Sequence, residues 1–123
     1  MDNTEFFDST ISLKDPNSIR VYLRIRPLNT KEQNEGYQNL LTTDNNNVFI
    51  AKTDDEKKKF TYDTVFSQQE SQDTVFKTIG CGLVDSFLEG YNCTMFAYGQ
   101  TGAGKTYTML GDPFNEVSRG LQP

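Results

Sequence analysis

One octapeptide has the residue types and the spacing that bind a triphosphate. It reads Gly99-Gln100-Thr101-Gly102-Ala103-Gly104-Lys105-Thr106. Its fixed positions match the phosphate-binding pattern G-x-x-x-x-G-K-[ST]. Because glycine has no Cβ, the backbone N–H groups of such a loop can approach phosphate oxygens closely. Lys105 is expected to reach the β- and γ-phosphates, and the Thr106 hydroxyl is expected to ligate Mg²⁺.

The segments on either side of the octapeptide predict a strand and a helix. Thr94–Tyr98 is a largely apolar run, as in a central strand covered by helices on both faces. Tyr107–Leu110 can open a helix, whose unpaired N–H groups and dipole would attract phosphate. A glycine-rich turn that binds nothing is the alternative. Average residue usage produces this pattern by chance at on the order of one position in 10⁴, which favours the binding site.

Alternating residues predict further strands upstream. Ser18–Leu28 alternates and contains Pro27, which ends a strand because it has no N–H to donate. In the polar leader before it, Thr10–Leu13 could form a short strand, or the leader could be a frayed terminus. A small meander follows, with turns at Asn45-Asn46-Asn47 and Asp54-Asp55-Glu56. Its expected strands are Gln38–Thr42, Val48–Lys52 and Lys59–Val65.

One amphipathic helix is expected between the meander and the apolar run. Ser67-Gln68-Gln69-Glu70 fits the capping-box pattern that starts a helix, and Gly90 is placed to end it. Apolar residues recur behind the cap at helical spacing. They are Val75, Phe76, Ile79, Leu83, Val84, Phe87 and Leu88. This apolar stripe is expected to face the core rather than a ligand.

Composition narrows the class of protein. The 123 residues form one domain or part of one, and a net charge of −5 argues against a basic surface that binds nucleic acid. With no histidine in the chain, a histidine-based metal site or catalytic base is excluded. Cys81 and Cys93 are expected to be reduced, in a helix and in a buried strand. No apolar run reaches a membrane-spanning length and the N-terminus has no signal-peptide character, so the chain is expected to be cytoplasmic.

Three blocks of the sequence resemble one known family. Phe96–Met109 is similar to the nucleotide-binding segment of kinesin motor domains, including the Tyr-Gly-Gln-Thr lead-in. Val21–Leu28 is similar to the family's first core strand with its R-x-R-P signature, and Phe60–Phe66 to its F-x-[FY]-D-x-V-F strand. The resemblance covers residues 18–123, after the leader at 1–17. It implies an α/β P-loop NTPase with a kinesin-type mixed central sheet flanked by helices, of which only the N-terminal part is present.

The resemblance also implies a function. The chain would be the ATP-binding portion of a motor that couples ATP hydrolysis to movement along microtubules, in the cytoplasm and on the cytoskeleton. Arg24, Arg26 and Pro27 would flank the adenine, with Tyr107 near the base, because an arginine plane and a ring can sandwich a purine. ATP and Mg²⁺ are the implied cofactors and the microtubule is the implied partner, with no nucleic acid and no membrane. Lys57-Lys58-Lys59 could contact tubulin or form a solvated hairpin tip.

Two motifs of the family do not occur in this sequence. They are the serine-rich switch I and the D-L-A-G-S-E switch II, and no strand ending in Asp follows the P-loop to complete a Mg²⁺ shell. The chain is therefore expected to be the N-terminal part of a motor domain, with no catalytic residue of its own. The alternative is a truncated or degenerate kinesin-like protein that at most binds nucleotide or a partner. An unrelated P-loop nucleotide kinase ranks lower, because the R-x-R-P block matches upstream.

The resemblance has a consequence for strand pairing. In kinesin-like sheets, the R-x-R-P strand and the strand before the P-loop are not direct neighbours. The strand before the P-loop has a neighbour on each side, and both neighbours come from parts of the motor domain that follow the P-loop in sequence. If this chain keeps that order, Thr94–Tyr98 is expected to have no pairing partner on either edge. The apolar helix is then expected to lack part of its cover.

We predict that residues 1–123 alone have no ATPase activity. Positioning the attacking water and stabilising the transferred charge require γ-phosphate contacts and a Mg²⁺ carboxylate that this sequence does not contain. The measurement is phosphate release by the purified chain with Mg·ATP and microtubules, with the Lys105→Ala chain as a control for contaminating ATPases. Release that exceeds both this control and a no-protein sample would contradict the prediction.

Overall fold

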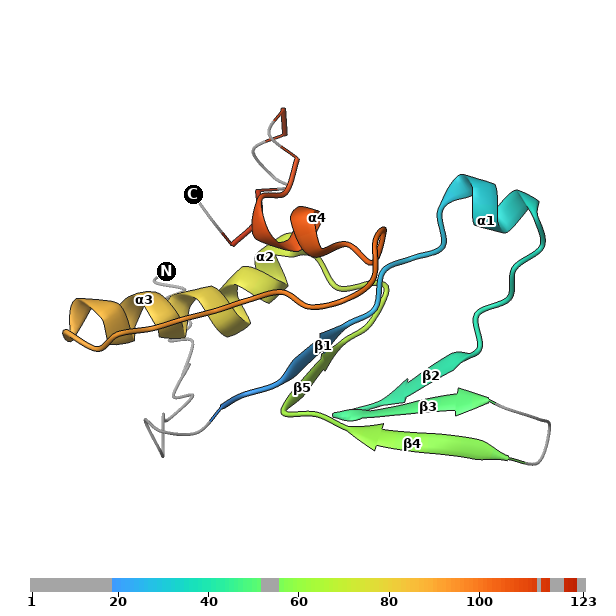
Figure 1. Ribbon diagram of the computed structural model, residues 1–123, viewed down its shortest axis with the longest axis horizontal. Helices are drawn as coiled ribbons and strands as arrows, with labels where there is room; N and C mark the ends of the chain where they lie inside the picture. The colour runs from blue at the N-terminus through green and yellow to red at the C-terminus, as the bar shows by residue number, and fades with distance from the viewer. Residues whose placement is uncertain (1–18, 52–55, 113, 116–118, 122–123) are drawn as a thin grey trace, which may run out of the picture. The chain divides into compact units, whose positions relative to one another are not determined.

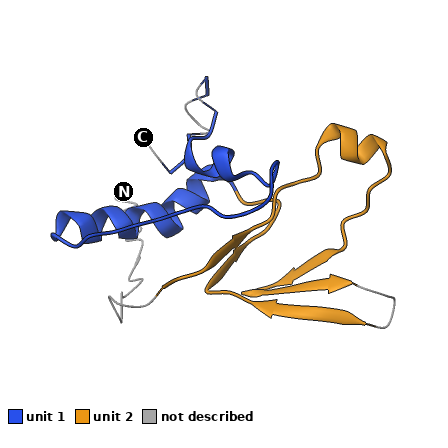
Figure 2. Ribbon diagram, viewed as in Figure 1, with its two compact units in different colours: residues 1–18, 71–123 blue, residues 19–70 orange. Residues whose placement is uncertain are grey.

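The computed structural model describes residues 19–51, 56–112, 114–115 and 119–121 (Figure 1). The chain divides into two compact units (Figure 2): unit 1 comprises Met1–Ser18 and Ser71–Pro123, and unit 2 comprises Ile19–Glu70. The leader at 1–17, with the strand expected at Thr10–Leu13, lies outside the described residues, and so does most of the turn expected at Asp54-Asp55-Glu56.

An antiparallel three-stranded sheet forms the meander of unit 2. Its strands, in spatial order, are β2 (Leu41–Asp44), β3 (Asn47–Ala51) and β4 (Lys57–Thr61). In the central strand, the buried Val48 lies opposite Thr43 on one side and Phe60 on the other. Asn45 takes the left-handed conformation (φ 49°) in the tight turn between β2 and β3, which asparagine tolerates better than most residues. The predicted meander is confirmed, with its strand bounds shifted.

Two short parallel strands form the other sheet of unit 2. β1 (Tyr22–Arg24) pairs with β5 (Thr64–Phe66), and a hydrogen bond from the Ile25 N–H to the Phe66 carbonyl (2.9 Å) extends the pairing. The rings of Tyr22 and Phe66 stack with their centroids 6.4 Å apart, and Phe66 is buried. β1 is shorter than the strand predicted for Ser18–Leu28, and it ends before Pro27 as expected.

The single strand predicted for Lys59–Val65 is wrong. β4 ends at Thr61, and β5 begins at Thr64 in the other sheet. The break lies at Asp63, whose carboxylate accepts a hydrogen bond from the Val21 N–H (2.7 Å) and whose own N–H donates to the Val21 carbonyl (3.0 Å). These two bonds tie the chain to the start of β1, so the backbone changes partner from β3 to β1.

Unit 1 contains one continuous helical run, coloured yellow to light orange in Figure 1. It consists of α2 (Gln72–Val75), the π-helical turn η1 (Phe76–Gly80) and α3 (Cys81–Leu88). Gly80 suits this turn because a Cβ at that position would lie 2.7 Å from the Phe76 ring. The run stops at Gly90, which is left-handed (φ 95°), as predicted. Within the described residues, no helix has the length and apolar character needed to span a lipid bilayer.

The predicted start of this helical run is wrong. The capping residue is Ser71, whose hydroxyl accepts a hydrogen bond from the Thr74 N–H (3.1 Å). Ser67, which was the predicted cap, accepts a longer hydrogen bond from the Gln69 N–H (3.4 Å), and its carbonyl accepts one from the Glu70 N–H (3.2 Å). Residues 67–70 therefore form a turn before the helix rather than its first turn.

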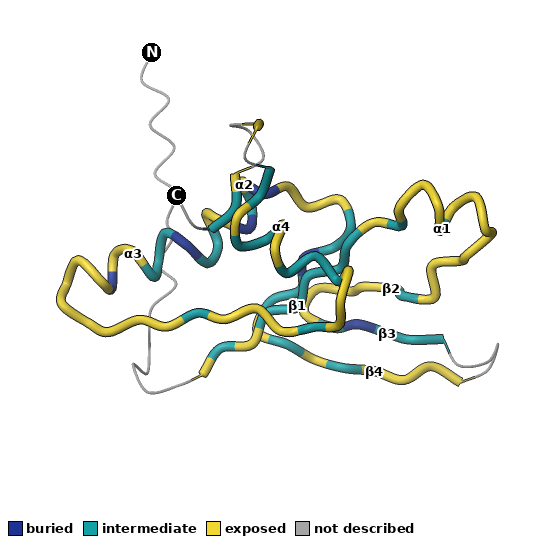
Figure 3. Tube along the Cα trace, turned by 45° about the horizontal axis from the view of Figure 1, so that its top comes forward, coloured by how far each residue is buried: buried dark blue, intermediate teal, exposed yellow. Residues whose placement is uncertain are grey.

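Only part of the predicted apolar stripe is buried (Figure 3). Val75 is buried, whereas Val84, Phe87 and Leu88 of α3 are exposed. The expectation that the whole stripe faces a core is therefore wrong. The described part of unit 1 contains no sheet that could cover the end of α3, because both sheets belong to unit 2.

Residues 91–99 form an extended segment that returns from the end of α3 toward α4 (Lys105–Met109) in Figure 1. Phe96 and Tyr98 are 80% and 97% exposed, and Cys93 is exposed as well. The prediction of a buried strand at Thr94–Tyr98 is wrong, because a strand needs a neighbour for its N–H and C=O groups. None of the described strands pairs with this segment. Cys81 lies half-buried in α3, as expected.

We predict that residues 1–123 alone do not unfold cooperatively. The described residues bury only three apolar side chains, those of Val48, Phe66 and Val75. Burial of apolar surface is the main favourable contribution to folding, and a core of this size leaves little to oppose the loss of conformational entropy. The measurement is thermal unfolding followed by circular dichroism, with amide hydrogen exchange in Thr94–Tyr98. A sharp transition and protected amides in a monomeric sample would contradict the prediction.

Candidate functional site

The backbone of the octapeptide Gly99–Thr106 requires glycine at specific positions. Gly102 and Gly104 have φ angles of 82° and 98°, in the left-handed region that other residues rarely adopt. Gly99 has a φ of 155°, and a Cβ at this position would lie 3.1 Å from the Cβ of Ala103. The path of the loop into α4 therefore favours glycine at positions 99, 102 and 104.

The backbone N–H groups of the octapeptide are largely unpaired. Among the described residues, the only backbone hydrogen bond that it donates runs from the Ala103 N–H to the Gln100 carbonyl (3.1 Å). In a glycine-rich turn, N–H groups that have no internal acceptor can point toward a common anion. The eight predicted phosphate-binding residues thus lie together in one loop of unit 1.

Lys105 contributes the positive charge of this loop. Its ammonium group folds back over the start of the loop and donates hydrogen bonds to the carbonyl oxygens of Gly99 (2.5 Å) and Gln100 (3.0 Å). These bonds use two of the three donors of the ammonium group. The side chain therefore already lies across the loop, where incoming phosphate oxygens could replace the two carbonyl oxygens.

Thr106 fits part of a Mg²⁺ shell. Its side chain is exposed, and its hydroxyl makes no hydrogen bond within the part of the chain that the structure describes. A hydroxyl oxygen is a suitable hard ligand for this ion. The described residues contain no cluster of three or more His, Cys, Asp or Glu side chains, so Thr106 would bind the ion together with phosphate oxygens rather than within a cage of protein ligands.

A buried amide anchors the helix that follows the loop. The Gln72 Nε2 donates a hydrogen bond to the Tyr107 carbonyl (2.7 Å), and Gln72 is buried. The same carbonyl accepts from the Gly111 N–H (2.8 Å). This contact links α2 to α4 across 35 residues of sequence. Sequence reasoning missed Gln72, because a glutamine just before an apolar stripe carries no signal of its own.

The residues expected around the adenine lie in both units. Arg24, in β1, and Arg26 and Pro27, just after it, belong to unit 2, and Tyr107 belongs to α4 of unit 1. The Arg26 guanidinium forms a two-pronged ion pair with Glu32, with Nη1–Oε2 and Nη2–Oε1 distances of 2.7 and 2.5 Å. Nη1 also donates to the Pro27 carbonyl (3.0 Å).

Glu32 belongs to the capping box of a short helix, α1 (Thr30–Asn34). The Glu32 N–H donates to the Asn29 side-chain oxygen (2.8 Å), and the Asn29 N–H donates to the Glu32 carboxylate (2.9 Å). The hydrogen bonds from Arg26 and then from Asn29 lower the pKa of Glu32 to about 2, and the hydrogen bond to Glu32 raises the pKa of Arg26. Both groups are therefore charged at neutral pH. The Asn29-x-x-Glu32 spacing could have revealed this cap from the sequence.

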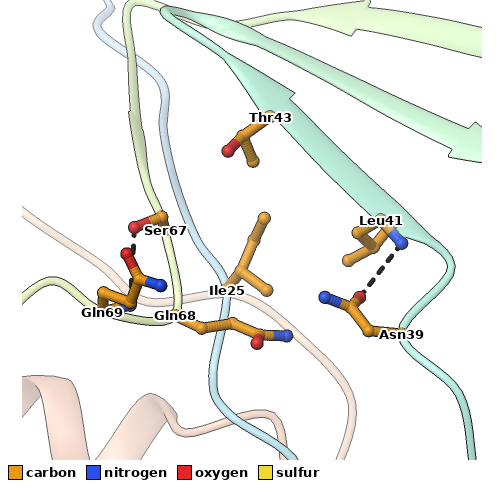
Figure 4. A pocket seen from close by; sticks show the side chains of 7 residues that line it. All are labelled: Ile25, Asn39, Leu41, Thr43, Ser67, Gln68 and Gln69. Carbon is orange, nitrogen blue, oxygen red and sulfur yellow. Dashed lines mark hydrogen bonds between the residues drawn. The ribbon is translucent and has the colours of Figure 1, made fainter.

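Unit 2 also has a small polar pocket of about 220 Å³ (Figure 4). It is lined by Ile25, Asn39, Leu41, Thr43, Ser67, Gln68 and Gln69. None of these side chains is charged, and the volume is below the roughly 300–1,000 Å³ of typical small-molecule sites. One polar group at the pocket already has a hydrogen-bond partner, because the Leu41 N–H donates to the Asn39 side-chain oxygen (3.0 Å). The pocket is therefore not a candidate for the triphosphate.

Fold and loop together define a class of protein. A glycine-rich loop with unpaired amides and a following Lys-Thr pair, between an extended segment and a helix, is the phosphate-binding arrangement of P-loop α/β proteins. Residues 24–123 match the family model of the kinesin motor domain. The chain therefore belongs to the kinesin motor-domain family.

Known relatives agree with this assignment. The chain is 44% identical over 107 residues to Kinesin-like protein KIN-14B of Oryza sativa subsp. japonica, covering 85% of this chain and 13% of that protein. It is 41% identical over 101 residues to human Centromere-associated protein E, covering 80% of this chain and 4% of that protein. A solved structure of KIF14, described as its ADP state in complex with a microtubule, superposes with a TM-score of 0.75 at 33% identity. That match covers 84% of this chain and 30% of the solved one.

We predict that Gln72→Leu lowers the free energy of unfolding by about 1 kcal/mol or more, because it removes the buried hydrogen bond to the Tyr107 carbonyl at nearly constant volume. The Tyr107 carbonyl keeps its bond to Gly111, which limits the loss. The measurement is urea unfolding of the longest natural protein that contains this sequence. Gln69→Leu is the matched control, since Gln69 is exposed. Equal stability of the two variants would contradict a structural role for the Gln72 contact.

Proposed function

We propose that this chain is the ATP-binding portion of a microtubule-based motor protein that couples ATP hydrolysis to movement. One observation carries the proposal: in a chain of the kinesin motor-domain family, the octapeptide presents unpaired amides around the Lys105 ammonium group. This arrangement offers several donors and one positive charge to a compact, multiply charged anion. The chain spans only a small part of the length of its relatives. The coupling of ATP hydrolysis to movement is therefore proposed for the complete motor and not for these residues alone.

The phosphate end of the nucleotide would lie in the octapeptide. Phosphate oxygens accept hydrogen bonds from the loop amides, and the Lys105 ammonium exchanges the carbonyls of Gly99 and Gln100 for the β- and γ-phosphates. Thr106 would hold Mg²⁺ through its hydroxyl. When bound, this ion neutralises part of the charge that builds up on the phosphates.

By the resemblance to the family, the residues proposed to contact the base are Arg24, Arg26, Pro27 and Tyr107. Tyr107 is partly exposed and anchored through its carbonyl, so its ring can present a face to a purine. Three of the five N–H donors of the Arg26 guanidinium are bound to Glu32 and to the Pro27 carbonyl. The planar guanidinium of an arginine at this position can stack on a base, as in cation–π stacking.

The partner of the proposed motor is the microtubule, and its proposed location is the cytoplasm, on the cytoskeleton. The KIF14 structure that resembles this chain is described with ADP and with a microtubule, which supports both ligands here. Release of the γ-phosphate would reorder the switch segments of the complete motor and so change its affinity for the track. Lys57, Lys58 and Lys59 of β4 are exposed on an outer strand of its sheet. We propose these three lysines as a candidate tubulin contact. Charged side chains on an edge strand also oppose unwanted pairing with a strand of another molecule.

We predict that Lys105→Ala weakens Mg·ATP binding by about 100-fold or more, because it removes the charged donor directed at the β- and γ-phosphates. The measurement is titration with a fluorescent ATP analogue in the longest natural protein that contains this sequence. Lys77→Ala is the control, because Lys77 is an exposed lysine of the same unit that pairs with Asp73. Wild-type affinity in Lys105→Ala would overturn the assignment of the phosphate site.

A further inference from the structure

A short segment near the end of the described chain, residues 119–121, is hydrogen-bonded to the C-terminal end of α4. The Leu121 N–H donates a hydrogen bond to the Thr108 carbonyl (3.0 Å), and the Gly120 N–H donates one to the Leu110 carbonyl (3.2 Å). We call residues 119–121 the capping segment. It belongs to unit 1, as do α4 and the octapeptide. Its two N–H groups therefore occupy carbonyl oxygens at the end of the helix that begins at the phosphate-binding loop.

α4 depends on such contacts because it is short. It has five residues, from Lys105 to Met109, and no side-chain hydrogen bond caps its N-terminal end. A helix of this length is unstable by itself, and its last carbonyl groups have no partner within the helix. The capping segment and the Gln72 amide supply partners from outside the helix. The placement of Lys105 and Thr106 at the start of α4 thus depends on contacts made at its other end.

The close approach of the capping segment requires glycine at position 120. A Cβ at Gly120 would lie 2.5 Å from the Met109 carbonyl oxygen and 2.6 Å from the Gly111 nitrogen. Non-bonded carbon atoms in favourable contact are about 3.5–4.0 Å apart. These neighbours are backbone atoms, which cannot rotate away as the end of a side chain can. Any side chain at position 120 would therefore displace either the capping segment or the end of α4.

We propose that Gly120 is a positioning residue of the phosphate site, which acts through the capping segment on α4 and so on Lys105 and Thr106. This inference rests on the proposed function, because it assigns a further residue to the same site. A side chain at position 120 separates the capping segment from α4 and loosens the helix whose first residues hold the phosphates. The loss of affinity is therefore the same for every ligand that carries the triphosphate, with or without a base.

A purely structural role of Gly120 would give a different result. If the capping segment only stabilised the fold, Gly120→Ala would lower the free energy of unfolding, but the folded molecules would bind with the affinity of the wild type. Dissociation constants measured well below the unfolding temperature therefore separate positioning from stability. Amide hydrogen exchange in α4 without nucleotide gives a second readout, because it reports local opening of the helix independently of any ligand.

The test compares Gly120→Ala with the wild type in the longest natural protein that contains this sequence. Binding of Mg·ATP and of Mg·triphosphate is expected to weaken by the same factor, about three- to tenfold. The amides of Thr108, Leu110 and Gly111, which donate to carbonyls one turn earlier, are expected to exchange on the order of tenfold faster without nucleotide. Gly82→Ala is the matched control, because a Cβ at Gly82 meets no atom within 4 Å. It should bind both ligands, and exchange in α4, as the wild type does.

If Gly120→Ala does not fold, Leu121→Pro replaces it, because it removes the N–H that donates to Thr108 and leaves Gly120 in place. Wild-type affinity in the variant, beside a loss in Lys105→Ala, would overturn the inference and leave the proposed function standing. Faster exchange with unchanged affinity would show that the capping segment only stabilises α4, and would overturn it as well. So would a loss for Mg·ATP without a loss for Mg·triphosphate. Wild-type affinity in Lys105→Ala would overturn the proposed function, and this inference with it.

Discussion

The backbone of the octapeptide is the constraint on which the candidate site depends. Its turns pass through left-handed conformations at Gly102 and Gly104, which leave the loop amides without internal acceptors and direct the chain into α4. The partner that we propose for these amides is the triphosphate of ATP. The Lys105 ammonium binds two carbonyl oxygens of the same loop, and under this proposal it would exchange them for phosphate oxygens.

Features set by neighbouring residues could be predicted from the sequence. The loop, the helix after it, the end of the helical run at Gly90 and the existence of the meander all follow from local rules, and the structure agrees. The capping-box pattern at Ser67–Glu70 predicted the wrong start for the helical run. Ser67 and Ser71 both precede possible first turns, and the structure starts the helix at Ser71. Gln72 then faces the Tyr107 carbonyl, a contact across 35 residues that no local pattern reveals.

Features that need a distant partner could not be predicted. Thr94–Tyr98 has the composition of a buried strand, but the described strands offer it no neighbour, and Tyr98 is 97% exposed. The strand predicted for Lys59–Val65 divides because the Asp63 carboxylate bonds to the Val21 N–H, 42 residues away. The ion pair of Arg26 with Glu32 is an intermediate case. The capping-box spacing was readable, whereas the orientation of the guanidinium depends on three-dimensional geometry.

We infer that the amides of the octapeptide bind the phosphates of ATP. The ¹H–¹⁵N spectrum of the longest natural protein that contains this sequence tests this binding when it is titrated with Mg·ATP and, separately, with adenosine. We expect saturable shifts of the Gly102, Gly104 and Lys105 amide resonances with Mg·ATP, and no shift of these resonances with adenosine. Unchanged resonances at these three amides in the presence of saturating Mg·ATP would show that the loop does not bind the phosphates.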